Sequence, residues 1–149
     1  LLDGEHVDPV AVRMALACKG PDGVCLITDA NIGAGLPPGR HSFVGGTKVE
    51  FRYAGGPARL VDGPHAGALA GSGLTMDCAV RNAVRMLGVD IAQAVRMASA
   101  NPARVLGLHE VKGDIRPGFD ADMVLLDRAL NVQRTWVAGE SKYARGATQ

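Results

Sequence analysis

Two residues, His6 and Asp29, are of types that do chemistry, and their spacing could bring them together. Asp29 directly follows a short run, Val24 to Thr28, that reads as a fully buried parallel strand. A carboxylate at the C-terminal end of such a strand can bind a metal ion, orient a water molecule, or act as a general base and acid. An aspartate is also common as a cap where a chain leaves a strand, so Asp29 alone does not decide between these roles.

His6 lies one helix and one strand upstream of Asp29. In a parallel βα array, this spacing puts both residues at the same mouth, on adjacent strands. Taken alone, a loop histidine is more often a surface or capping residue. Asp3 and Asp8 flank His6, and either could hydrogen-bond its imidazole or be an ordinary turn or cap residue, the interpretation we favour for Asp8.

A third candidate is the segment "ALAGSGLTM", residues 68–76. Small residues before a helix N-terminus let a ligand approach the backbone amides, although no P-loop pattern is present. A polar, glycine-rich loop that docks a helix explains the segment equally well. His41, His65 and His109 lack the spacing of metal ligands, so we expect no complete metal site within this sequence.

The secondary structure that must position these groups begins with the end of a strand, followed by a helix and a second strand. Asp8 and Pro9 have the types of an N-cap and a first turn for a helix through Lys19, and with the strand at 24–28 this is half of a βαβ repeat. Gly-Gly turns and alternating residues then predict a small antiparallel excursion near 43–61. The later predictions are helices at about 75–87, at 90–99 with Asp90 as N-cap, and from Asn101 as N-cap to Gly107, followed by strands around a turn at Ala138-Gly139.

Composition narrows the class of protein. The 149 residues carry 16 basic and 15 acidic side chains, which leaves no electrostatic footprint for nucleic acid or an anionic membrane surface. The sequence shows no membrane span and no signal peptide, and its three cysteines form no CxxC pair, so we expect reduced thiols in a cytoplasmic protein. The sequence starts with Leu1 rather than methionine, and we expect it to be the C-terminal part of a longer protein.

Five segments, in this order and at this spacing, resemble the C-terminal part of N-acetylglucosamine-6-phosphate deacetylases of the amidohydrolase superfamily. They are "DGEHVDP", "LITDA", "LAGSGLTMDCAVRN", "ASANPARVLGL" and "KGDIRPGFDADMVLLD". The resemblance runs from about Leu1 to Gly139. The last segment is shared across many amidohydrolases, whereas the pattern formed by the first three is much more specific to the deacetylases.

The resemblance implies an α/β fold, the C-terminal portion of a (β/α)8 TIM barrel with part of a flanking β-sandwich. Residues 1–107 would supply the barrel portion, including the antiparallel insertion near 43–61, and residues 108–149 the C-terminal strands of the sandwich. The implied reaction is metal-dependent hydrolysis of the N-acetyl group of N-acetylglucosamine-6-phosphate to glucosamine-6-phosphate and acetate. The family also implies a homodimer for the full-length protein.

Within this resemblance, Asp29 matches the family's catalytic aspartate. It would take a proton from a metal-bound water as that water attacks the amide carbonyl, and then deliver the proton to the leaving amine. His6 matches a histidine that contacts the sugar, with Asp3, Gly4 and Glu5 in the same loop.

Leu69, Ala70 and Gly71 match a backbone segment that lines the sugar pocket. The ligands of the divalent metal, zinc or a similar ion, would lie upstream of this stretch, leaving Asp29 a contact through metal-bound water at most. We therefore expect these 149 residues alone to be inactive. The alternatives are another amidohydrolase-superfamily hydrolase, dihydroorotase-like or dipeptidase-like, and a non-catalytic fragment that lacks the metal ligands.

Overall fold

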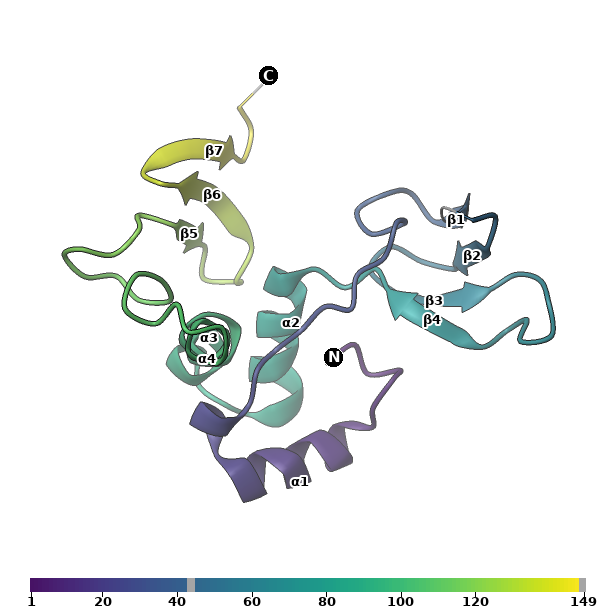
Figure 1. Cartoon of the computed structure of the whole chain (residues 1–149), viewed down its shortest axis with the longest axis horizontal. Coiled ribbons are helices and arrows are strands. Elements are labelled where there is room, and N and C mark those ends of the chain that lie inside the picture. The colour runs from purple at the N-terminus through teal and green to yellow at the C-terminus, as the bar shows by residue number, and fades with distance from the viewer. Residues whose placement is uncertain (43–44, 148–149) are drawn as a thin grey trace.

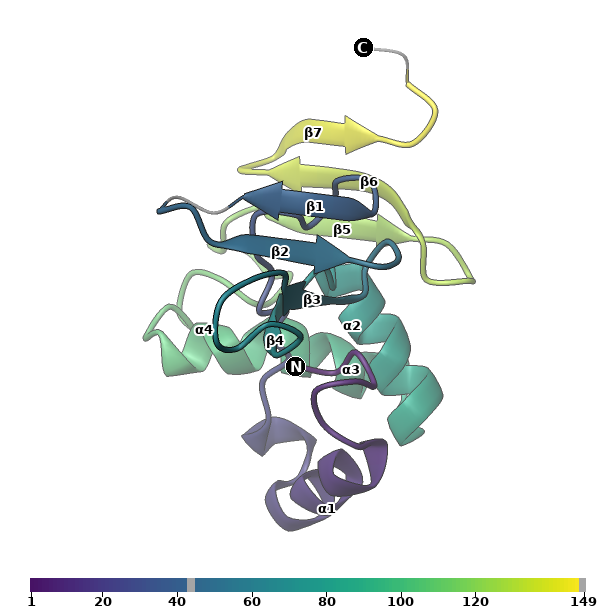
Figure 2. The ribbon, with the colours of Figure 1, turned by 90° about the vertical axis from the view of Figure 1, so that its right-hand side faces the viewer.

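Helices and two small antiparallel sheets make up this α/β chain in a computed structural model, which describes residues 1–42 and 45–147 (Figure 1). Figure 2 shows the second sheet near the top of the molecule and the first helix at the bottom, with part of the first sheet level with the other helices. In the described part, no helix has the length and hydropathy to span a bilayer. The helices are α1 (Pro9–Lys19), α2 (Met76–Asn82), α3 (Ile91–Ala98) and α4 (Ala100–Val105), with a 3-10 turn η1 (Pro21–Gly23) and a π-helical segment η2 (Ala83–Leu87).

Both sheets are simple meanders in which each strand is antiparallel to the one before it. The first contains β1 (Gly39–Ser42), β2 (Lys48–Phe51), β3 (Pro57–Leu60) and β4 (Leu69–Ser72). The second contains β5 (Met123–Leu126), β6 (Val132–Val137) and β7 (Glu140–Ala144), with the predicted Ala138-Gly139 turn between β6 and β7.

The first sheet confirms the predicted antiparallel excursion but is wider than 43–61, whose first residue, Phe43, lies outside the described residues. The prediction of a loop before α2 was wrong, because residues 69–72 pair with β3 as a fourth strand. The register is irregular there, with Pro57 opposite Ser72 and Arg59 opposite Leu69. Small residues disfavour a strand by propensity, but pairing and burial override that preference.

The larger core lies between the helices and the two extended segments that begin the chain. Leu2 and Leu26 from those segments pack with Leu74, Val80 and Met97 from around α2 and α3. A smaller core under the first sheet consists of Val49, Phe51 and Ala58. None of the described residues after Ala103 belongs to the buried core, so the second sheet has no core of its own.

The segment 24–28 is extended but is not a strand of a sheet, contrary to the prediction. The segment is not fully buried as predicted, because Leu26 is buried but Ile27 is 53% exposed. The N–H of Leu26 donates to the carbonyl of Met97 over 2.8 Å. Just beyond, Ala30 forms an isolated parallel bridge with Ser72. A strand is defined by a ladder of hydrogen bonds to a neighbour, and the described residues place no such neighbour along 24–28.

The helix ends follow local signals where those signals are uncontested. Asp8 caps α1 by accepting from the N–H of Val10 over 2.7 Å, and Asp90 forms a full capping box with Gln93 on α3. The prediction of Asn101 as the N-cap of α4 was wrong, because that helix begins at Ala100. Asn101 is 3% exposed, and its amide instead donates to the carbonyls of Pro21 and Val24 over 2.7 and 2.6 Å.

Candidate functional site

Asp29 lies exposed at the end of the extended segment and has a left-handed backbone, with φ of 49°. A non-glycine residue in that conformation is uncommon, although aspartate adopts it more readily than most. Its carbonyl accepts from the N–H of Ser72 over 2.8 Å, and Asn31 donates back to the Ser72 carbonyl over 3.0 Å. Asp29 therefore presents its carboxylate at the surface while its backbone is bound to β4.

Gly71 in β4 is the residue that lets Asp29 come so close. Its φ is +79°, and a Cβ placed on it would stand 2.9 Å from the Asp29 carbonyl oxygen. Only glycine satisfies both constraints. The loop after Asp29 is packed as tightly, because the Phe51 ring fills the space beside Gly33 where a Cβ would project.

His6 is held by Asp3 at the other candidate position. The imidazole Nδ1 lies 2.7 Å from Asp3 Oδ2, and the N–H groups of Glu5 and His6 both donate to Asp3 Oδ1 over 3.0 Å. The Asp3 side chain is 3% exposed. Burial opposes its ionisation, but these hydrogen bonds from His6 and Glu5 prevail and hold the Asp3 pKa below its usual value.

The Asp3 carboxylate fixes the tautomer of His6. An ionised carboxylate only accepts hydrogen bonds, so Nδ1 carries the proton, and in the neutral ring Nε2 is left as an acceptor. Nε2 is buried and has no hydrogen-bond partner among the described residues. A buried acceptor without a partner is rare, so Nε2 marks a place for a hydroxyl or amide donor from outside the described residues, once the atoms that cover it move aside.

Helix α2 and its continuation η2 position this loop. Asn82 donates to the carbonyl of Leu2 over 2.8 Å, and the Met86 methyl group lies 3.1 Å from the position that a Cβ on Gly4 would take. Gly4 has φ of +80°, a conformation that favours glycine. The Met86 carbonyl itself accepts from Arg13 of α1 over 2.7 Å.

The first sheet contacts the His6 loop through the turn after β2, and that same turn is hydrogen-bonded to the end of β4, to which Asp29 is bound. Tyr53, in the turn after β2, donates to Glu5 over 3.3 Å. Burial and the neighbouring Glu5 charge raise the pKa of this Tyr53 phenol. Gly56 of the same turn accepts from the N–H of Gly73, directly after Ser72 of β4.

The three residues matched to a sugar-lining segment all lie in β4. Leu69 is 39% exposed, whereas Ala70 packs against the smaller core. The Ala70 carbonyl accepts from the Asn31 side chain over 2.7 Å, which leaves Gly71 nearest to the Asp29 backbone. The structure thus brings Gly71 against the Asp29 backbone and Ala70 against Asn31, two residues further along.

Residues 1–42 and 45–147 contain no group of three or more His, Cys, Asp or Glu side chains that could hold a metal ion. Asp29 and His6 are therefore not part of a ligand set within the described chain. The donors needed for a tetrahedral or octahedral site would have to come from elsewhere.

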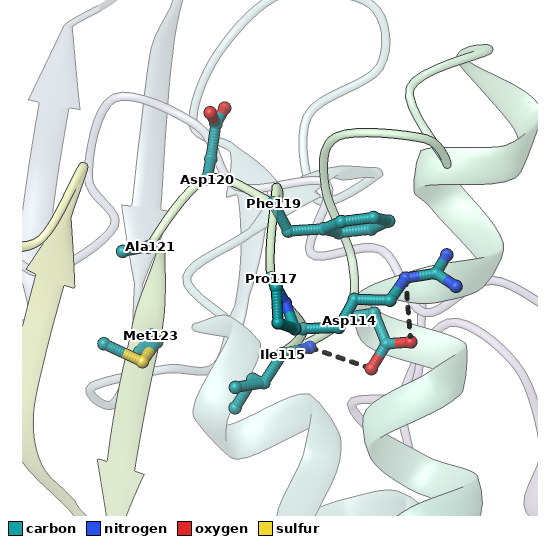
Figure 3. Close-up of a pocket in the computed structure, with 8 residues that line it drawn as sticks. Asp114, Ile115, Pro117, Phe119, Asp120, Ala121 and Met123 are labelled. Atoms are coloured by element: carbon teal, nitrogen blue, oxygen red, sulfur yellow. Dashed lines mark hydrogen bonds and ion pairs between the residues drawn. The ribbon is translucent and has the colours of Figure 1, made fainter.

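Two hollows lie apart from these candidates. One, of about 290 Å³, lies between Asp114 and Met123, and Figure 3 draws its lining. The Arg116 guanidinium there lies 4.2 Å from the centre of the Phe119 ring. The other, of about 780 Å³, separates α2, α3 and α4 from β5 and β6 and is lined largely by apolar side chains, among them Val95, Leu106 and Ile115. Neither hollow is lined by Asp29, His6 or residues 69–71, although Met76, at the end of the candidate segment 68–76, lines the larger one.

Sequence reasoning missed Ser72, Asn31 and Tyr53. Ser72 lies inside the segment "ALAGSGLTM", but its spacing gives no sign of the hydroxyl's contacts with Thr28 and Leu74. Asn31 follows Asp29 by two residues, and its side chain accepts from Gly33 in an Asx turn, a signal that could have been read. Tyr53 gave no signal beyond an aromatic residue in an alternating segment.

Comparison with known proteins places the chain in a family. The model of a protein family described as "Amidohydrolase family" matches residues 58–142. An Escherichia coli O157:H7 protein named N-acetylgalactosamine-6-phosphate deacetylase is 42% identical over 140 residues, covering 94% of this chain and 35% of its own length. The human protein named N-acetylglucosamine-6-phosphate deacetylase is 39% identical, covering 94% and 32%. A shorter relative from Escherichia coli K12 is 42% identical, and the match covers 79% of it.

Solved structures of deacetylases are also similar to this chain. The crystal structure of N-acetylglucosamine-6-phosphate deacetylase from Pasteurella multocida superposes with a TM-score of 0.84 at 33% identity, covering 95% of this chain and 35% of that one. A Mycobacterium smegmatis deacetylase, solved as an aspartate-to-alanine mutant in complex with N-acetyl-D-glucosamine-6-phosphate, gives a TM-score of 0.79 at 34% identity. The chain spans about a third of the length of most of these proteins.

Proposed function

The chain belongs to the amidohydrolase family, and we propose that it is part of an enzyme that hydrolyses the N-acetyl group of N-acetylglucosamine-6-phosphate. The observation that carries this proposal is similarity along nearly the whole chain to proteins named as deacetylases of amino-sugar phosphates. N-acetylgalactosamine-6-phosphate is the second candidate substrate, because the relative named for it is 42% identical.

In the proposed reaction, Asp29 acts first as a general base and then as a general acid. Its carboxylate takes a proton from a water molecule while the water oxygen bonds to the acetyl carbon. The C–N bond then breaks, the proton moves from Asp29 to the leaving nitrogen, and acetate and the free amine are released. The exposed carboxylate on a fixed backbone suits both transfers, since each needs a group placed within hydrogen-bond reach of the substrate.

His6 binds the sugar in this proposal rather than moving protons. Asp3 keeps the proton on Nδ1, so Nε2 accepts a hydrogen bond from a sugar hydroxyl. Gly4 and Glu5 shape the same loop, while Leu69, Ala70 and Gly71 supply backbone along the sugar. Hydroxyl recognition by an oriented acceptor is specific, because a substrate without that hydroxyl leaves Nε2 unpaired.

Three features support a (β/α)8 barrel with a flanking sandwich, divided near residue 107, as the larger fold. The apolar segment 24–28 has no ladder partner, and its Ile27 is 53% exposed although Leu26 is buried. The second sheet lacks a core of its own, and the 780 Å³ hollow beside it is apolar. Barrel strands from outside this chain would pair with the segment 24–28, and sandwich strands would cover the second sheet and the apolar hollow beside it.

Amidohydrolases generally depend on a metal ion. The described residues do not fit a metal site by themselves, because they contain no cluster of three ligand side chains. A metal in the proposed enzyme would therefore be held by residues outside this chain, and the role given to Asp29 is derived from its carboxylate alone.

The test is acetate release by the complete product of the gene that encodes this chain. We expect turnover of N-acetylglucosamine-6-phosphate, or of N-acetylgalactosamine-6-phosphate if the second candidate is right, and little turnover of the sugars without phosphate. Absence of acetate release from both phosphates, with divalent metal supplied, would overturn the proposal. N-acetylmannosamine-6-phosphate is a useful control, because it differs from the first substrate only in the configuration of the carbon that bears the amide.

A further inference from the structure

We propose that Ser72 and Asn31 are positioning residues, which hold Asp29 in its left-handed backbone conformation and so fix the direction of its carboxylate. We call this pair the β4 clamp. The effect on catalysis rests on the proposed function, whereas the contacts that support the clamp are observed within this chain.

Ser72 is bonded to residues on both sides of Asp29. Its side chain is fully buried, and its hydroxyl donates to the Thr28 carbonyl over 2.9 Å. Its backbone N–H donates to the Asp29 carbonyl, and its carbonyl accepts from the N–H of Asn31. Thr28, Asp29 and Asn31 are thus all hydrogen-bonded to Ser72.

The Ser72 hydroxyl is itself held in place, because its oxygen accepts from the N–H of Leu74 over 2.8 Å. A buried hydroxyl is costly unless it is hydrogen-bonded, and an alanine would fill almost the same space without that cost. The hydroxyl therefore contributes orientation: it joins the end of β4 to the carbonyl that precedes Asp29.

Asn31 completes the clamp from the far side of Asp29. Its side-chain N–H donates to the Ala70 carbonyl over 2.7 Å, while its side-chain oxygen accepts from the N–H of Gly33 over 3.1 Å. Together the two residues hold the segment on β4 at both ends of a single left-handed residue. Strained conformations of this kind persist only where the surroundings over-determine them.

Loss of the clamp should affect the chemical step and not sugar binding. Without it, Asp29 can relax toward an ordinary backbone conformation, which swings its carboxylate away from the water and the leaving amine. A misplacement of about 1 Å can reduce a rate by about a hundredfold. The His6 loop is held by other contacts, through Asn82 and Met86, so loss of the Ser72 hydroxyl should change sugar binding little. Asn31→Ala also frees the Ala70 carbonyl in the segment proposed to line the sugar, so only kcat is compared for that variant.

The experiment measures kcat and KM for acetate release by the complete gene product carrying Ser72→Ala, Ser72→Thr or Asn31→Ala, well below the melting temperature of each. We expect Ser72→Ala to lower kcat by about 10- to 100-fold with KM within about twofold, and Asn31→Ala to lower kcat by about tenfold. Ser72→Thr keeps the hydroxyl and should recover most of kcat. Asp90→Ala is the control, because it removes the capping box of α3 and lowers stability without contact with Asp29.

A kcat unchanged in either Ser72→Ala or Asn31→Ala would overturn the inference. A kcat that falls only in proportion to the folded fraction, as Asp90→Ala would show, would overturn it too. If Ser72→Ala does not fold, Asn31→Ala alone decides. Asp29→Asn in the same assay distinguishes failure of the clamp from failure of the proposed function. Wild-type activity of Asp29→Asn would refute the proposed role of Asp29. An inactive Asp29→Asn beside a fully active Ser72→Ala would refute only the clamp.

Discussion

Replacing Asp3 with asparagine should reverse the tautomer of His6 with little change in shape. The two backbone N–H groups that point at Asp3 Oδ1 need an acceptor, so the new amide keeps its oxygen there. Its NH₂ group then takes the place of Oδ2, 2.7 Å from the imidazole. An NH₂ group can only donate, so Nδ1 must become the acceptor, and the ring proton moves to Nε2.

The cost to stability follows from the bonds exchanged. Three charge-assisted hydrogen bonds, worth about 1.5–3 kcal/mol each, become neutral ones worth about 0.5–1.5 kcal/mol each, and the loss is partly offset because a buried charge is removed. The net loss is about 1–2 kcal/mol, which lowers Tm at pH 7 by about 2–8 °C for a chain of this length. The opposite flip of the amide would leave two backbone N–H groups facing donors, and so is disfavoured.

The loss should depend on pH with a definite sign. The Asp3 pKa is lower in the folded chain than in the unfolded chain, so its ionisation stabilises the fold above the unfolded value of about 3.9. That stabilisation disappears as the pH falls through the folded pKa. The Tm of Asp3→Asn should therefore lie below that of the wild type at neutral pH and converge with it in acid.

Nitrogen-15 NMR of histidine-labelled protein reads the tautomer directly, and His6→Gln assigns the signal among the four histidines. We expect the neutral ring to carry its proton on Nδ1 in the wild type and on Nε2 in Asp3→Asn. The same tautomer in both proteins would refute the orientation argument. A Tm difference that stays constant down to acid pH would refute its electrostatic part.

Two further changes test how the frame of the site is held. Phe51→Ala should cost about 3–5 kcal/mol in urea unfolding, because Phe51 is 3% exposed at the centre of the smaller core; a cost below 1 kcal/mol would show that this core does not stabilise the sheet. Lys112→Met should destabilise the chain at neutral pH only, because the Lys112 ammonium, with help from the Ala138 N–H, holds the Asp122 pKa below its usual value. That stabilisation is present above the unfolded carboxyl pKa and lost as the pH falls through the folded one, so an equal loss at pH 7 and in acid would contradict the ion pair.

The features that could be predicted from the sequence are those decided locally. Asp8 and Asp90 were recognised as caps because a cap is settled by one side chain and the next few backbone N–H groups. The antiparallel pairing of β2 and β3 follows from alternation and glycine turns. The hydrogen bond between Asp3 and His6 was one of two readings, since both residues lie in one short loop.

The features that could not be predicted depend on distant partners. Asn101 has the type and position of a cap, but two carbonyls more than seventy residues away take its side chain into the core. The segment 24–28 is apolar enough for a buried strand, yet strand formation requires a neighbour that the described chain does not provide. Ser72 gave no signal at all, because its value lies in contacts with Thr28 and Asp29.

The role of Asp29 as the proton-transferring group is the central claim, and acetate release by Asp29→Asn tests it most directly. Asparagine has the same shape and tolerates the left-handed backbone, and the side chain is exposed, so folding and Tm should be preserved. We predict a fall in kcat of about 10²- to 10⁴-fold, the range for loss of a general base. Turnover of N-acetylglucosamine-6-phosphate near the wild-type rate by folded Asp29→Asn would contradict the assignment.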